Sequence, residues 1–183
     1  MVMRLLNRWR GDRRGVAAVE FAFIAPILIL SYFAVAELSG AMLAGRKAGH
    51  EASEVGDLVA QCQTIAASDF TDVWTIGGEV MEPLSTTPLS MRVTSIVANA
   101  AGATTVGWSF DNGGALTKYA TGATITAPTG LVPASGSVIM SETRYVYTSP
   151  VGIVVKSALP FNNTFYLAPR QTTIITLGTA CGL

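Results

Sequence analysis

A long apolar run lies near the N-terminus of the chain. Residues 16–36 read VAAVEFAFIAPILILSYFAVA, and their only charged side chain is that of Glu20. At 1.5 Å per residue the run forms a helix of about 31 Å, enough to cross the hydrocarbon core of a bilayer. Pro26 lies inside the run, and in a membrane helix we expect a proline to kink the helix rather than end it. The pattern therefore predicts one membrane-spanning helix.

A helical period follows the apolar run. Between Val55 and Ala66 apolar residues recur at spacings of three and four, and polar residues mark the opposite face. We therefore expect a helical extension outside the membrane over residues 37–69, which covers a globular body with its apolar side. The segment from Phe70 to Met81 fits either a second short helix or a turn region.

Beyond Pro88 the pattern changes to short segments rich in β-branched residues and separated by turn residues. Residues 149–163 are expected to be a loop whose apolar side chains could contact a partner. The fold class predicted is α+β, with a long N-terminal transmembrane and amphipathic helix packed on a C-terminal antiparallel β-sheet in a mainly β body, residues 70–183. The strands expected are 91–97, 104–110, 123–126, 138–147 and 171–177.

Charge is distributed unevenly around the apolar run. Five arginines precede residue 16 with one acidic residue among them, whereas after Lys47 five basic residues stand against nine acidic ones. Because basic residues favour the cytoplasmic side of a membrane, we expect residues 1–15 to be cytoplasmic and the body to be periplasmic or extracellular. An arginine cluster can also bind DNA. Here the apolar run follows it directly and other parts of a DNA-binding module are missing, so no nucleic-acid partner is expected.

Three interpretations of the apolar run remain open, and Glu20 distinguishes them. A secretory signal cleaved after Ala36 usually has a shorter run without a carboxylate. An uncleaved single-pass anchor that presents a periplasmic binding module gives Glu20 no role. A carboxylate in a membrane costs a few kcal/mol unless it is paired. Cleavage between Gly15 and Val16 would create an α-amino cation on Val16, which could meet Glu20 of a neighbouring subunit and fix the register between subunits.

The residues around this junction resemble a type IV prepilin cleavage site. Arg13, Arg14 and Gly15 precede VAAVEF, so Glu20 is the fifth residue after the junction and Phe21 follows it. The stretch RRGVAAVEFAFIAPILIL most resembles the TadE-like pseudopilins of the tight-adherence (Tad) pilus system. The resemblance is strong over residues 10–60 and weak beyond. It implies a pilin-like fold, cleavage after Gly15 by a membrane-embedded prepilin peptidase, and a role for Glu20 and Phe21 in assembly.

The same resemblance implies a minor pilin, or pseudopilin, in the assembly of a Tad-type adhesive pilus. It leaves a tip component and an assembly factor as alternative roles. The implied partners are the lipid bilayer, the prepilin peptidase, other pilin and pseudopilin subunits, and the pilus assembly platform. The implied location is a bacterial inner membrane, with a single span, a cytoplasmic N-terminus and a periplasmic body, or a surface pilus that incorporates the subunit.

Two cysteines, Cys62 and Cys181, lie far apart in the sequence. No CxxC motif and no second histidine accompany them, so a zinc site is not expected. In an exported body a disulfide between them is expected, with two unpaired buried thiols as the alternative. The bond would close a loop of more than a hundred residues, and it would contribute roughly 4 kcal/mol in the chain-entropy model.

The sequence offers little that points to catalysis. His50 is the only histidine, and we expect it to be exposed on the helix. It has no arrangement of serine or cysteine around it that suggests nucleophilic catalysis, and no phosphate-binding loop follows a predicted strand. We therefore expect a protein without enzymatic activity and without a cofactor.

Overall fold

The computed structural model of the chain describes residues 15–183. The arginines of the predicted leader, residues 1–15, therefore lie outside the described residues. Two helices and six strands follow in chain order: α2 (Val16–Ala60), β1 (Thr64–Ile65), α3 (Asp69–Val80), β2 (Leu89–Ala98), β3 (Thr104–Asp111), β4 (Ser137–Tyr147), β5 (Leu159–Leu167) and β6 (Thr176–Leu177).

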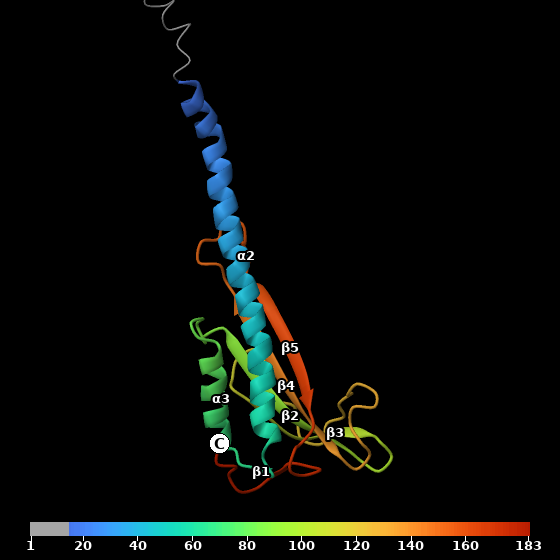
Figure 1. Cartoon of the computed structure of the whole chain (residues 1–183). Coiled ribbons are helices and arrows are strands. Elements are labelled where there is room, and N and C mark those ends of the chain that lie inside the picture. Colours follow the sequence, from blue (N-terminus) through green and yellow to red (C-terminus); the bar gives the residue numbers. More distant parts are fainter. Residues whose placement is uncertain (1–14) are drawn as a thin grey trace, which may run out of the picture.

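Helix α2 is one continuous helix of 45 residues, about 68 Å long at 1.5 Å per residue. Pro26 lies inside it and does not end it, as the sequence predicted. The N-terminal half of α2 projects away from every other described element, and the C-terminal half lies along the sheet (Figure 1). The first buried residue of the helix is Glu37, so the fold itself separates a free half from a packed half.

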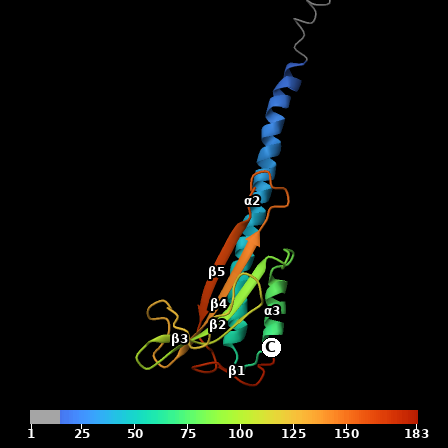
Figure 2. The same cartoon turned by 180° about the vertical axis from the view of Figure 1, so that it is seen from behind.

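Strands β2 to β5 form an antiparallel sheet in the order β3-β2-β4-β5. The packed half of α2 lies against β4 and β5, and α3 packs beside α2. Figure 2, seen from behind, shows the sheet, α3 and the packed half of α2 along the same length of the molecule. The predicted α+β fold, a long apolar helix packed on an antiparallel sheet, is confirmed.

Small residues on α2 make its close approach to the sheet possible. Ala41, Ala44, Ala48 and Ala52 form a buried stripe, which continues as larger side chains toward the end of the helix. A Cβ added at Gly56 would lie 2.5 Å from Cδ1 of Leu167, closer than real Cβ contacts. The glycines of α2 therefore serve to seat side chains of β4 and β5.

The second face of the sheet is covered by the long connection between β3 and β4. Arg92 of β2 donates to both carboxylate oxygens of Glu142 of β4, at 2.7 and 2.8 Å. The ring of Tyr119, from the connection, lies under the guanidinium at 3.9 Å, within cation–π range. Both faces of β2 are consequently buried.

The helical extension predicted over residues 37–69 is too long, because α2 ends at Ala60. The chain then turns so that Ile65 enters the core and Thr64–Ile65 pairs with β6 in parallel. These tertiary contacts override a helical pattern that continued to Ala66. The ambiguous segment after it is the helix α3, not a turn region.

Three of the loop and strand predictions are wrong in part. Residues 123–126 form only a single bridge between Thr105 and Thr124. Of residues 171–177 only the last two form a strand, because side chains satisfy backbone carbonyls there: Trp108 donates to Ile175 and Ser137 to Thr173. The loop predicted over 149–163 ends earlier, since β5 begins at Leu159 and pairs with the free side of β4.

Candidate functional site

The free half of α2 is an exposed apolar surface. Among the described residues α2 is the one helix long and apolar enough to cross a membrane, and no residue of its most apolar 18-residue window is buried. From Val16 to Ala36 none of the side chains is buried against the body. A contiguous apolar surface of this size marks contact with a membrane or with a partner.

The Gly15–Val16 junction stands at the free end of this helix. Gly15 has φ −86° and ψ −11°, a conformation open to any residue, and its carbonyl accepts the N–H of Val19 at 3.1 Å. Apart from its own chain neighbours and the nearby backbone of the helix, no described atom lies within 4 Å of the place where a Cβ at Gly15 would stand. The fold of residues 15–183 therefore gives no reason for a glycine at this position, and the reason lies elsewhere.

Glu20 and Phe21 lie on the exposed helix, one turn beyond Val16. Phe21 has 67% of its surface exposed, and the side chain of Glu20 is exposed as well. None of the ion pairs formed within residues 15–183 involves Glu20. A residue four positions beyond Val16 shares a helix face with it, so both ends of the predicted pairing are available to another molecule on one side of α2.

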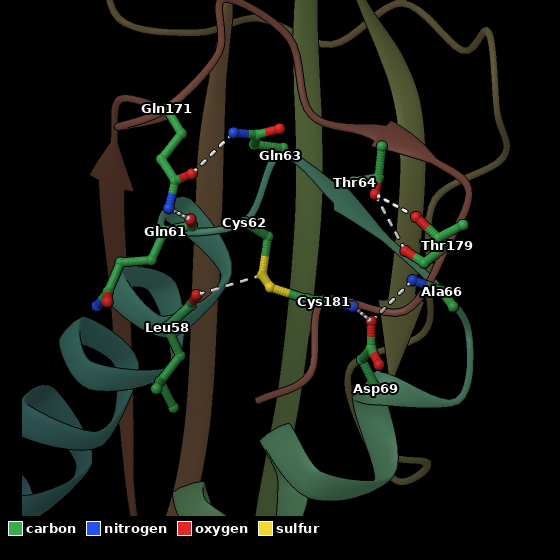
Figure 3. The surroundings of a disulfide bond; sticks show 10 residues. All are labelled: Leu58, Gln61, Cys62, Gln63, Thr64, Ala66, Asp69, Gln171, Thr179 and Cys181. Carbon is green, nitrogen blue, oxygen red and sulfur yellow. Dashed lines mark hydrogen bonds between the residues drawn. A yellow bond between two sulfur atoms is a disulfide. The ribbon is translucent and has the colours of Figure 1, made fainter.

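Cys62 and Cys181 are joined by a disulfide, with their Cα atoms 5.6 Å apart. The alternative of two unpaired thiols is therefore wrong. Figure 3 shows that Asp69 stabilises the chain around the disulfide. Its Oδ2 accepts the N–H of Cys181 at 2.7 Å and that of Ala66 at 2.9 Å. The bond fastens the C-terminal segment to the end of α2 that is far from the exposed apolar half.

Glu51 is a buried carboxyl group that belongs to none of the motifs recognised in the sequence. It is fully buried between α2, α3 and the sheet. The hydroxyl of Thr143 donates to its Oε2, and its Oε1 has no hydrogen-bond partner. Burial raises the pKa of Glu51 to about 8. Its spacing from Ala44, Ala48 and Val55 places it in the buried stripe of the helix, which is the signal that could have found it.

Catalytic or metal-binding arrangements are not found in the part of the chain that the structure describes. Over residues 15–183 no three His, Cys, Asp or Glu side chains converge on one point. His50 is exposed on α2, as expected, and its Nδ1 lies 3.6 Å from Oε1 of Glu54. A wide-open pocket between α3 and β2 includes Glu79, Glu82 and Asn112 in its lining, without a nucleophile paired to a base.

Comparison with protein families gives one match. A family model described as TadE-like protein matches residues 15–56. Comparison with curated proteins and with solved structures found no match. The matched segment begins at Gly15 and ends inside α2, so it contains the free junction, Glu20, Phe21 and the exposed apolar surface. Residues 15–56 are thus similar to TadE-like proteins, and we refer to them as the TadE-like segment.

Proposed function

We propose that this protein is a minor pilin, or pseudopilin, of a Tad-type adhesive pilus. It is inserted with its N-terminus in the cytoplasm, cut after Gly15 by a prepilin peptidase, and assembled through residues 16–36. The observation that carries the proposal is the combination of a glycine that the fold does not require and an exposed glutamate on an exposed apolar helix. Both lie inside the TadE-like segment.

Gly15 serves the peptidase in this proposal. A protease binds its substrate as extended backbone, and a side chain next to the cut bond would obstruct that backbone. In the structure the residue has free space around it and ordinary helical angles. A larger residue would therefore leave the fold intact while it blocks processing, and this separates the two roles in an experiment.

Glu20 serves assembly. Cleavage leaves an α-amino cation on Val16, at the N-terminus of a helix that lies within the membrane. An unpaired charge at that depth is costly, and Glu20 has no partner within residues 15–183. Pairing of the Val16 amine with Glu20 of a neighbouring subunit removes both unpaired charges and fixes the axial register of the two helices. Phe21 lies beside this pair as an apolar contact.

The partners follow from this scheme. They are the lipid bilayer of the inner membrane, the prepilin peptidase, other pilin and pseudopilin subunits, and the assembly platform of the pilus. The chain divides into a cytoplasmic leader (1–15), a membrane helix (16–36), its packed continuation on α2, and a periplasmic body. Its role is structural, in contrast to the alternative of an uncleaved anchor that presents a binding module.

The mature N-terminus tests the proposal directly. In cells with an active prepilin peptidase, N-terminal sequencing of the protein recovered from the membrane and soluble fractions together should give Val16, and the Gly15→Val variant should retain Met1. Ala22→Val adds a similar side chain to the exposed helix beyond the junction and should be processed normally. A wild-type protein that starts at Met1 supports the uncleaved anchor, and a start at Glu37 supports a released secretory domain.

Glu20→Ala should leave insertion of the protein in the membrane intact or improve it, because a carboxylate is costly there. Incorporation into pili should be lost. Immunoblots of membrane and sheared-pilus fractions measure the two outcomes. Glu20→Gln keeps the size of the side chain without its charge and should behave like Glu20→Ala. If piliation is normal in these variants, while deletion of the protein abolishes pili, the assembly role of Glu20 is wrong.

A further inference from the structure

The loop between β4 and β5 is fastened to α2 at one point. The carboxylate of Glu37 accepts three consecutive backbone N–H groups of this loop: those of Ile153 at 2.8 Å, Val154 at 3.0 Å and Val155 at 2.6 Å. Glu37 is only 2% exposed. The Val155 N–H above all, with the other two, holds the pKa of Glu37 below its ordinary value. The tie is therefore a charged one, from a carboxylate to main-chain donors.

The position of Glu37 along α2 places this contact at the end of the predicted membrane span. Glu37 directly follows the exposed apolar residues 16–36, which span about 31 Å as a helix. When those residues fill the hydrocarbon core, Glu37 lies at its edge. Figures 1 and 2 both show the loop beside α2 beyond the end of the sheet, on the side of the free half of the helix.

The outward side chains of the loop are apolar. Outside α2 the described residues include seven exposed large hydrophobic side chains, and Val151, Ile153 and Val154 of this loop are three of them. Residues 148–158 carry no acidic side chain, and their one charged residue, Lys156, is exposed. On the adjacent helix Leu38 is 59% exposed. Apolar side chains with a nearby lysine suit the boundary between acyl chains and lipid phosphates.

We propose that residues 148–158 form a membrane-contacting loop, which Glu37 holds against α2 so that Val151, Ile153 and Val154 enter the headgroup–acyl boundary of the bilayer. The occupant is phospholipid, because the apolar surface of the loop continues the apolar surface of the membrane helix at the depth where that helix leaves the hydrocarbon. Lys156 pairs with lipid phosphate. The inference rests on the membrane span of the proposed function, and it adds a second contact that sets the depth and tilt of the body.

The experiment measures depth at three sites of the full chain, with the native disulfide intact, in vesicles of phosphatidylethanolamine and phosphatidylglycerol. A nitroxide spin label is attached to Val154→Cys in the loop, Phe23→Cys in the apolar helix, or Leu131→Cys on the body. Collisions with oxygen, which partitions into lipid, are compared with collisions with a water-soluble nickel chelate. We expect the oxygen-to-nickel ratio at residue 154 to be several-fold higher than at residue 131, and lower than at residue 23.

The three labels separate the possible failures. A low ratio at residue 23 means that α2 does not cross the bilayer, and the proposed function fails with the loop. A high ratio at residue 23 together with equal ratios at residues 154 and 131 overturns the loop proposal alone. If neither reagent reaches the label at residue 154, the loop is covered by protein, such as a second copy of the chain. This result also overturns the loop proposal.

The role of Glu37 has its own variant. Glu37→Ala removes the acceptor of the three N–H groups, so the label at residue 154 should gain mobility and its oxygen-to-nickel ratio should fall to that of residue 131. The label at residue 23 should keep its ratio. Glu54→Ala removes an exposed carboxylate from the same helix and should change neither site. If the mobility and the oxygen-to-nickel ratio of the label at residue 154 are unchanged in Glu37→Ala, Glu37 does not hold the loop in the membrane.

Discussion

Replacement of both Cys62 and Cys181 by serine should lower the free energy of unfolding of the body by about 4–5 kcal/mol. The disulfide joins residues 119 positions apart, so its loss frees a long loop in the unfolded chain. Urea unfolding of the full chain in detergent, followed by tryptophan fluorescence, measures the change. Trp108 reports on the core because it is 3% exposed and packs against Phe70, with the centroids of the two rings 5.8 Å apart.

Reduction of the wild-type protein is the matched control, because it breaks the same bond without changing any other atom of the side chains. It should move the urea midpoint in the same direction and by a similar amount. The local consequence should be fraying of the C-terminal segment, where Thr64–Ile65 pairs with Thr176–Leu177 and Asp69 accepts the N–H of Cys181. Equal midpoints for the oxidised, reduced and serine forms would contradict a stabilising role for the bond.

Patterns that are local in the sequence predicted most of the fold. The apolar run gave the free half of α2, since membrane-length hydrophobicity is a property of consecutive residues. The predicted bounds of β2 and β4 lie within two residues of the observed ones, because β-branched residues favour extended backbone whichever strand pairs with them. Cleavage at Gly15 and the assembly role of Glu20 stay predictions, which rest on one contiguous motif inside the TadE-like segment.

Features that depend on distant partners could not be predicted in this way. Asn162 and Asn163 favour turns locally, yet they lie in β5 because they pair with Arg144 and Thr143 on the free side of β4. Helix α2 ends early because Ile65 is needed in the core. The bonds of Glu37 join residues 116 to 118 positions apart, so no window of sequence contains both sides of that contact.

Glu51 should make the stability of the body fall as the pH rises from about 4.5 to about 8. Its pKa is about 8 in the folded protein, against 4.5 for an ordinary glutamate. Between these values the unfolded chain releases the proton and the folded chain keeps it. The free energy of unfolding therefore falls with each step to higher pH. This difference in pKa between the folded and the unfolded chain corresponds to about 4–5 kcal/mol of stability. Urea unfolding at pH 5, 7 and 9 measures the loss.

Comparison with Glu51→Gln isolates this effect from the other titrating groups. Glutamine accepts the hydroxyl of Thr143 as the carboxyl group does, but its amide leaves donors without a partner in a site where Oε1 already has none. The variant should therefore be no more stable than wild type at pH 5, and more stable at pH 9, where wild type must bury a carboxylate. Glu54→Gln changes an exposed carboxylate on the same helix and should follow wild type at every pH. If the free energies of unfolding of wild type and Glu51→Gln change in parallel with pH, then Glu51 ionises in the folded protein without a loss of stability. The space between α2, α3 and the sheet would then admit water.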